Sequence, residues 1–574
     1  MREEREELAG RAKKWENELY PNAAAKLRMG DTTAPHAYTP LDTAGHDFLR
    51  DVGLPGEYPF TSWNYPTRMP FEEAGAHSLN RAGRYSGYGT ADDSRVYFEK
   101  MSAMGLRLGG PNVASDLPSQ LGWDSDDPRS AGEVGRVGVT VDSLRDFEIL
   151  YAPFVGPDNI DTISTNWTIN APAAVYMAFY CALADKRGIP RKALRCTPQN
   201  DILKEYIARG QYIFPVEPSM RLVRDTIEWV TKEMPKSNAI SICAEHIRYA
   251  GSTAAQSIAF AFANGEAYVN LGLSRGLAVD EFVPRFTYRG FGDSTLDFYR
   301  GIATPRASRR IWARIMREKF GAKNDKTCLL RGGEHAWGNA YMKMTAQRPV
   351  NNIVRQTLEA LIFGLASGQH TGSIPFDEPL GLGHSIEAQQ IRRDLERILH
   401  FEARITDQID PFAGSYFMES LTDEIEEEIL TELRAVEEIG GASAAVESGY
   451  YKRAVGDAAW KSQRDIETGD EVWVGVNRFT GPDEIDVHIE RSSEYDAGQL
   501  ATAEERQVES VKSLRLERDS AAVDRTLSAL RSVARDHEAN IMPALIECAH
   551  AYATIGEICD VLRDEFGTAE LPYE

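Results

Sequence analysis

From about residue 51 to residue 421, short runs rich in β-branched and aromatic residues alternate with longer stretches of helical periodicity. This alternation predicts parallel βαβ units, with amphipathic helices such as Ile202–Arg209 and Leu222–Lys232 between the strands. The predicted strands are Val134–Val141, Asp161–Ile169, Ala193–Thr197, Ala239–Ala244, Phe282–Tyr288, Thr327–Arg331 and Gly364–His370. About seven or eight such units predict an α/β fold of the (β/α)8 TIM barrel type.

The segments on either side of this region have a different composition. Residues 1–50 are polar and irregular apart from a predicted helix at Arg2–Leu19, and they predict an N-terminal arm. Residues 422–574 predict a mostly helical C-terminal region. Its predicted elements are the helices Asp423–Glu438, Thr502–Glu538 and Gly556–Phe566 and a small β-prone run at Val472–Phe479. We therefore expect an arm, a barrel at residues 51–421 and a helical extension.

The composition disfavours several classes of protein. With 574 residues, 42% of them hydrophobic and 26% charged, the chain is typical of a large globular protein. The net charge of −23 disfavours nucleic acid and anionic membrane surfaces, because both need a basic face. The longest nearly uncharged apolar stretch, Ala171–Ala184, is too short to span a bilayer. Six scattered cysteines and the lack of a signal-peptide pattern favour a cytoplasmic protein with free thiols and no structural metal site.

Polar residues stand at the ends of most of the predicted strands, where barrel enzymes build their active sites. They are Asn166, Asn170, Thr197, Gln199, Asn200, Glu245, His246, Arg285, Arg331, His370 and Thr371. Any single one of these residues could be structural. Six strand ends with the same feature favour a site that orients a polar substrate.

Seven blocks carry the most specific patterns in the chain. They are Gly122–Asp142, Thr197–Met220, Asp280–Phe286, Asn351–Leu361, Phe376–Leu382, Asp410–Tyr416 and Val474–Phe479. In this order they resemble the methylmalonyl-CoA mutase family, and the likeness extends from about Gly56 to Gly567. The resemblance implies a barrel with the acyl-CoA along its axis and adenosylcobalamin over its mouth. It also implies a radical 1,2-rearrangement of the acyl carbon skeleton, with the protein orienting the substrate and excluding water.

The resemblance also implies roles for individual residues. His246 matches the active-site histidine that hydrogen-bonds the thioester carbonyl, on which charge develops. Thr197 and Gln199 match residues around the acyl group, and Arg209 matches the arginine that pairs with the carboxylate of dicarboxylic substrates. The implied cofactor contacts are Gln120, Tyr249 and Glu378. The implied CoA contacts are Arg285 and Arg331, because guanidinium groups suit phosphate.

Several positions depart from the family pattern. Met69 stands where a tyrosine is usual, and Glu245 replaces the tyrosine before the histidine. Ala114 stands where the 2-hydroxyisobutyryl mutases have an aspartate, and Ser62 replaces an arginine beside the phosphates. We expect Met69 and Ala114 to line the substrate pocket and Glu245 to act with the histidine. Together these changes predict an atypical substrate.

The cobalamin-binding domain of the family is expected to be absent from this chain. Its DxHxxG motif has only a faint counterpart at Asp486–Arg491, which lacks the glycine, and no Rossmann-like unit follows. The resemblance therefore implies a large subunit that binds adenosylcobalamin together with a separate small subunit. The implied assembly is a heterotetramer built on a homodimer of large subunits. The acyl carrier is left open between coenzyme A and an acyl-carrier protein.

Two other functions fit part of the sequence. A non-catalytic barrel subunit is favoured by the replaced tyrosines, whereas the retained His246 and Arg209 oppose it. The other is a barrel lyase that binds CoA without cobalamin. Because a buried carboxylate needs a partner, we expect Glu245 to pair with Arg209, which would favour an uncharged or hydroxylated acyl group. The alternative is that Glu245 turns away to hold His246 or a ribose hydroxyl, which leaves Arg209 free for a dicarboxylic substrate.

Overall fold

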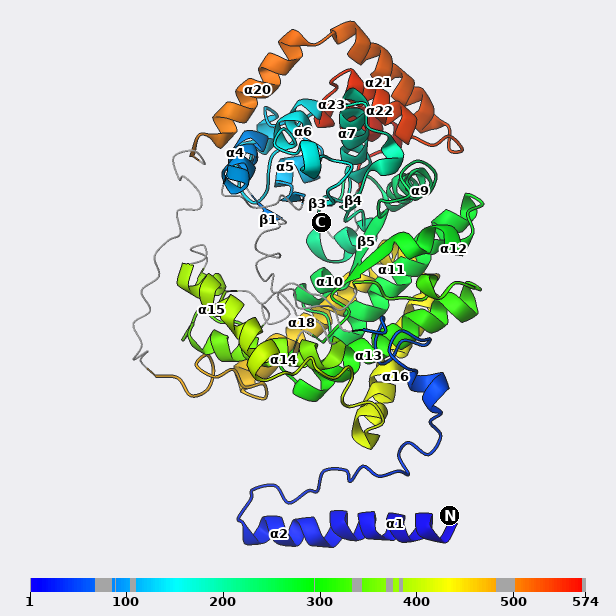
Figure 1. Cartoon of the computed structure of the whole chain (residues 1–574), viewed down its shortest axis with the longest axis vertical. Coiled ribbons are helices and arrows are strands. Elements are labelled where there is room, and N and C mark those ends of the chain that lie inside the picture. The colour runs from blue at the N-terminus through cyan, green and yellow to red at the C-terminus, as the bar shows by residue number, and fades with distance from the viewer. Residues whose placement is uncertain are drawn as a thin grey trace.

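The strands of the protein run parallel and follow one another in chain order (Figure 1). The computed structural model describes residues 2–67, 85–87, 89–103, 110–293, 295–332, 343–367, 375–380, 386–481 and 501–569. The strands are β1 (Tyr85–Ser86), β2 (Asn112–Ala114), β3 (Thr165–Thr168), β4 (Cys196–Pro198), β5 (Ile240–Cys243) and β6 (Phe286–Arg289). One parallel sheet has the order β1-β2-β3-β4, and β5 pairs with β6 in a second parallel sheet.

Backbone hydrogen bonds connect the two sheets. The Ser241 amide donates to the Gln199 carbonyl at 2.9 Å, and the Asn238 amide donates to the Cys196 carbonyl at 2.8 Å, so β5 lies beside β4. Beyond β6, the Tyr288 amide donates to the Arg331 carbonyl at 3.1 Å. The predicted α/β class with parallel strands is therefore confirmed. Within the described residues the strands do not close into a ring.

The two faces of these strands differ in chemistry. The paired registers place Val113, Trp167, Cys196, Ile240, Ile242, Phe286 and Tyr288 on one face. All of these belong to the main hydrophobic core, beneath the helices. The opposite face, called the polar face below, carries Asn112, Ala114, Asn166, Thr168, Thr197, Ser241, Cys243, Thr287 and Arg289. Because successive side chains of a strand point to opposite faces, this alternation divides the sheet into an apolar and a polar side.

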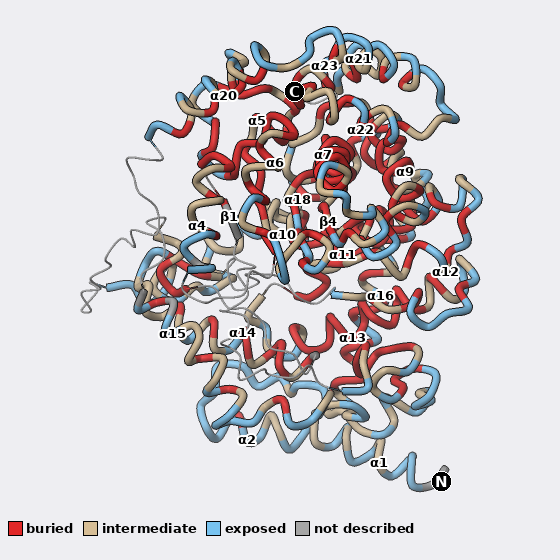
Figure 2. Tube along the Cα trace, turned by 45° about the horizontal axis from the view of Figure 1, so that its top comes forward, coloured by how far each residue is buried: buried red, intermediate tan, exposed pale blue. Residues whose placement is uncertain are grey.

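One or more helices follow each strand along the chain. They are α4 (Ala91–Ala103), α5 (Leu117–Gln120), α6 (Leu144–Leu150), α7 (Ala173–Lys186), α8 (Ile202–Lys204), α9 (Val216–Glu233), α10 (Glu245–Tyr249), α11 (Ala254–Ser274), α12 (Val279–Phe282), α13 (Phe298–Arg314), α14 (Asn351–Ser367) and α15 (Ile386–Arg397). Helix α7 is buried on every side over Ala173–Ala184, which explains its uncharged sequence (Figure 2). Within the described residues, no helix combines the length and apolar character needed to cross a bilayer. All six cysteines are buried and free, as predicted.

The C-terminal helices lie on two different parts of the molecule (Figure 1). Helix α16 (Tyr416–Ile439) packs on α11 and α13, and it is followed by α17 (Ala442–Glu447) and α18 (Tyr450–Thr468). The later helices are α20 (Ala503–Glu517), α21 (Ser520–Arg535), α22 (Met542–His550) and α23 (Ile555–Phe566). Of these, α22 packs against α7. On α20, the Gln507 amide nitrogen donates to the buried carboxylates of Asp142 and Asp146 at 2.7 and 2.9 Å.

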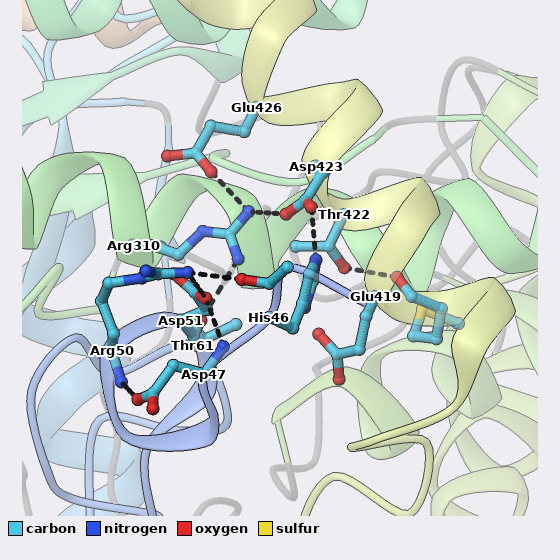
Figure 3. A network of polar contacts seen from close by, with 12 residues as sticks. His46, Asp47, Arg50, Asp51, Thr61, Arg310, Glu419, Thr422, Asp423 and Glu426 are labelled. Atoms are coloured by element: carbon cyan, nitrogen blue, oxygen red, sulfur yellow. Dashed lines mark hydrogen bonds and ion pairs between the residues drawn. The ribbon is translucent and has the colours of Figure 1, made fainter. Parts of the chain in front are cut away.

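Charged contacts hold the segment after the N-terminal helices against α13 and α16 (Figure 3). The buried Arg310 guanidinium pairs with Asp423 at 2.6 Å and with Glu426, and it also donates to the Asp51 carbonyl at 3.2 Å. The His46 ring contacts the other oxygen of Asp423 at 2.5 Å. The helices that precede this segment, α1 (Arg2–Lys14) and α2 (Tyr20–Lys26), are mostly exposed and lie apart from the body (Figures 1 and 2).

Several predicted elements are wrong. Val134–Val141 forms no strand, and its described pairing is an isolated bridge between Ser115 and Val139. Next to this bridge, the Gly138 backbone lies so close to the Ser115 backbone that a Cβ atom on Gly138 would stand 2.1 Å from it. The predicted strand from Gly364 begins inside α14, and its last residues lie outside the described ones. Thr327–Arg331 contributes only the one backbone bond to β6. The short strands β1 and β2 were not predicted.

Candidate functional site

The carboxyl end of β5 leads directly into α10, which carries Glu245 and His246 at its first two positions. The end of β6 lies against this turn. Gly290 has a φ of 76°, and a Cβ atom on it would stand 2.5 Å from the Cβ of Glu245. Only glycine allows this approach, so the ends of β5 and β6 form one compact corner.

Glu245 is 2% exposed, and both of its carboxylate oxygens accept hydrogen bonds. Arg289 donates from Nε to Oε2 at 2.6 Å, and Tyr249 donates from its hydroxyl to Oε1 at 2.7 Å. The expected pair of Glu245 with Arg209 is therefore wrong. The strand register sets Cys243 opposite Arg289, which brings the arginine to the carboxylate that follows β5. Burial and then this carboxylate raise the pKa of the Tyr249 hydroxyl, which stays protonated.

A largely buried polar network lies beside this corner, and we call it the Glu205 network. Its members are Asn170, Gln199, Lys204 and Glu205. Oε1 of Glu205 accepts from Asn170 Nδ2 at 2.6 Å and from Lys204 Nζ at 2.7 Å, and Lys204 also donates to Gln199 Oε1 at 2.8 Å. Arg209 closes the π-helical turn Glu205–Arg209, and its Nη1 stands 3.5 Å from Oε1 of Glu205. That distance makes an ion pair without a hydrogen bond.

His246 is surrounded by positive charge. Burial lowers the pKa of its imidazole well below the usual range, and Lys204, Arg209 and Arg289 lower it further. The ring is therefore neutral at physiological pH, with one N–H donor and one acceptor nitrogen. Its Nδ1 is buried and has no hydrogen-bond partner among the described residues.

The cations around His246 are compensated unequally. Lys204, Arg209 and Arg289 all lower the pKa of its imidazole. Among the described residues, Arg289 pairs with Glu245, whereas Lys204 and Arg209 share Glu205, and Lys204 also interacts with the buried carboxyl group of Asp201. Arg209 is therefore the cation with the weakest compensation.

The amino ends of β5 and β6 hold a second group of cations. Arg331 donates to Asn238 Oδ1 at 2.7 Å, and Asn238 donates to Thr197 Oγ1 at 2.8 Å. Arg285 ends the turn before β6. Burial lowers the pKa of Arg331, and the positive charge of Arg285 lowers it further. Two guanidinium groups this close to each other favour an anion between them. Both were expected at the carboxyl ends of strands, but their contacts place them at the opposite ends.

Comparison with known proteins identifies the family to which this arrangement belongs. The family described as Methylmalonyl-CoA mutase matches residues 29–568. The chain belongs to the methylmalonyl-CoA mutase family. This is a family of cobalamin-dependent isomerases.

Individual relatives differ in length. The 2-hydroxyisobutanoyl-CoA mutase large subunit of Aquincola tertiaricarbonis is 38% identical over 542 residues, which cover 94% of this chain and 92% of the relative. The probable mitochondrial methylmalonyl-CoA mutase of Caenorhabditis elegans is 38% identical over 91% of this chain. The human mitochondrial methylmalonyl-CoA mutase is 36% identical over 90%. The chain spans 66% and 65% of the length of these two longer relatives.

The remaining family positions are distributed around the polar face. Ala114 ends β2 and is buried, and its register partner Thr168 confirms that it stands on the polar face. Gln120 ends α5 and donates to the Ser115 carbonyl at 2.7 Å, while its own buried Oε1 has no partner in the described part of the chain. Glu378 begins a short turn and is partly exposed. Met69, His370, Thr371 and Asp486–Arg491 lie outside the described residues.

Three residues of the site were not singled out from the sequence: Lys204, Glu205 and Arg289. The strand predicted at Phe282–Tyr288 ends one residue too early, and extending it by one position would have revealed Arg289. Lys204 and Glu205 lie inside a matching block, but a Lys-Glu pair at the start of a helix normally indicates an exposed surface. Only their complete burial distinguishes them.

Proposed function

We propose that this chain is the catalytic large subunit of an adenosylcobalamin-dependent acyl-CoA mutase. The reaction would be a radical 1,2-rearrangement of the acyl carbon skeleton. The observation that carries the proposal is the layout of the polar face. It has paired guanidinium groups at the amino ends of its strands and a neutral, buried-ring histidine at the carboxyl ends. An acyl-CoA has the same order of groups, with phosphates at one end and a thioester at the other.

The polar face also supports a closed barrel around the substrate. In a (β/α)8 barrel, bulky branched side chains normally fill the interior. Here the corresponding positions are mostly small and polar, for example Thr197, Ser241 and Thr287. A barrel lined in this way would leave space along its axis. We propose that the chain forms such a barrel around the substrate.

The residues of this chain would bind and orient the acyl-CoA. Arg285 and Arg331 would hold its phosphates. His246 would donate its single N–H to the thioester carbonyl, and this bond would strengthen as negative charge develops on the oxygen. Glu245 and Tyr249, bonded to each other, would form a wall that keeps water from the reacting carbons.

The cobalamin contacts would lie at the same mouth. Gln120 follows β2 on its carboxyl side, and its unpartnered buried Oε1 suits an amide N–H of the corrin. Tyr249 and Glu378 are the other candidates. Adenosylcobalamin, when bound, supplies the radical that starts the rearrangement.

A separate small subunit would complete the cobalamin site. A relative that is named a large subunit is covered over 92% of its length, whereas 66% of the longer relative from Caenorhabditis elegans is covered, so about one third of its length lies outside the match. We propose a heterotetramer with two large subunits, located in the cytoplasm. The weak compensation of Arg209 beside His246 supports an acyl group with a negative charge, in place of the uncharged or hydroxylated group expected from the sequence.

The test combines the purified chain with a small subunit of the two-component mutase type and adenosylcobalamin. Methylmalonyl-CoA, 2-hydroxyisobutyryl-CoA and isobutyryl-CoA are offered, and the products are identified by mass spectrometry. Rearrangement that requires all three components supports the proposal. Product formation without cobalamin would establish the lyase, and binding of CoA esters without any turnover would establish the non-catalytic subunit. The chain alone should bind adenosylcobalamin weakly.

A further inference from the structure

Arg289 has hydrogen-bond donors that the described protein does not use. Its Nε donates to Glu245, but neither terminal nitrogen has an acceptor among the described residues. The side chain is 34% exposed, whereas the Glu245 carboxylate that holds it is almost completely buried. The carboxylate therefore fixes the plane of the guanidinium, and the two terminal nitrogens remain available to a ligand.

The position of Arg289 places these donors at the acyl end of the site. It stands on the polar face, on the strand next to the one that leads into His246. Arg209 and Arg289 both lower the pKa of His246, so both lie close to the ring. The histidine thus has a guanidinium group from each of two separate elements near it.

A purely structural role explains this pair poorly. Replacing a buried ion pair by apolar side chains of similar volume is often neutral or stabilising, so the pair is not needed to hold the corner together. A fixed guanidinium with free donors has a chemical use only when an acceptor oxygen is placed against it.

We propose that Arg289, oriented by Glu245, is a specificity-determining residue that binds an oxygen on the acyl chain of the substrate. The oxygen belongs to a carboxylate or a hydroxyl group. This inference rests on the proposed function, because it requires an acyl-CoA in the site. An acyl chain that carries only methyl groups would leave the two donors desolvated and unpaired, and would bind less tightly.

The experiment measures binding of three CoA esters to the full chain by titration calorimetry, without cobalamin. Succinyl-CoA carries a terminal carboxylate, 3-hydroxybutyryl-CoA a hydroxyl group, and butyryl-CoA neither. At least one oxygenated ester should bind the parent chain more tightly than butyryl-CoA, by roughly 10- to 100-fold. The ester that shows the preference identifies the group.

The key variant is Glu245→Gln/Arg289→Gln, which leaves no unpaired charge in the corner. It should lose the preference for the oxygenated ester, measured as the ratio of its Kd for butyryl-CoA to its Kd for that ester. Glu245→Met/Arg289→Met, which keeps the volume, is the second variant and should behave in the same way. Arg209→Gln is the matched control on the other side of His246.

The outcomes separate the two hypotheses. If both double variants keep the full preference while Arg209→Gln removes it, Arg289 is not the specificity residue, although the proposed function stands. Equal binding of all three esters to the parent chain also overturns the inference alone. If the parent chain binds none of the esters, the proposed function fails, and the inference fails with it.

Discussion

The substitution His246→Ala tests the central residue of the site. Because the pKa of His246 lies well below its usual range, the ring is neutral and, in the proposed function, would offer a single N–H to the thioester oxygen. Losing one donor to developing negative charge typically lowers kcat by about 10²- to 10³-fold, which corresponds to about 2.7–4 kcal/mol. KM should change little, since this bond strengthens only as the reaction proceeds.

Steady-state rates of the reconstituted complex between pH 6 and pH 8 provide the assay. The low pKa predicts that His246 does not titrate in this window, so parent and variant should have pH profiles of the same shape. His246→Asn, which keeps an amide donor, should retain part of the lost activity. The reasoning is refuted if kcat of His246→Ala equals that of the parent. It is also refuted if the parent shows an inflection near pH 6.5 that the variant lacks.

Three further substitutions test the fold around the site. Arg306→Met removes the fully buried partner of Glu419, held at 2.7 Å, and should lower the free energy of unfolding by about 3–5 kcal/mol in urea titrations. Burial, and then the neighbouring Asp146 carboxylate, raise the pKa of Asp142, so the folded protein binds this proton more tightly than the unfolded chain does. The stability that this carboxyl group contributes is therefore present at low pH and is lost as the pH rises. Asp142→Asn should therefore stabilise the chain more at pH 8 than at pH 5, as measured by urea titration at each pH. Ser241→Leu should leave the melting temperature unchanged or raise it, and should abolish CoA-ester binding in calorimetry, because it fills the polar face.

The sequence predicted the regular parts of the fold because their patterns are local. Strands β3 and β5 lie within the predicted runs, and β4 extends one residue past the run predicted at Ala193–Thr197. The helix predicted at Leu222–Lys232 lies within α9. Val134–Val141 has the composition of a strand, but Gly138 makes a close backbone contact with Ser115. Ser115 is distant from Gly138 in sequence, so local composition does not reveal this contact. Strands β1 and β2 are two and three residues long, too short to form a pattern.

The candidate site was predicted less completely than the fold. Gln199 and Arg209 follow from a matching block, and His246 follows from its own match to the family histidine. The structure brings them together with a buried lysine and two carboxylates. The partner of Glu245 could not be predicted, because it depends on the register between β5 and β6. Arg209 was the partner expected from the sequence, with His246 or a ribose hydroxyl as the alternative, whereas Arg289 reaches the carboxylate across the sheet.

The polar face explains why the weakest predictions fell near the site. A strand buried on both faces reads as a continuous apolar run, which is easily recognised. Here every second residue faces a space that a substrate would occupy, so threonine, serine and asparagine interrupt the run. At these positions a large apolar side chain would strengthen the strand pattern but fill that space. A small polar side chain would leave room for a ligand but weakens the strand pattern. We therefore propose that departures from the expected barrel interior mark the positions that would contact the substrate. Arg289, the largest side chain among them, would have the greatest reach toward its acyl group.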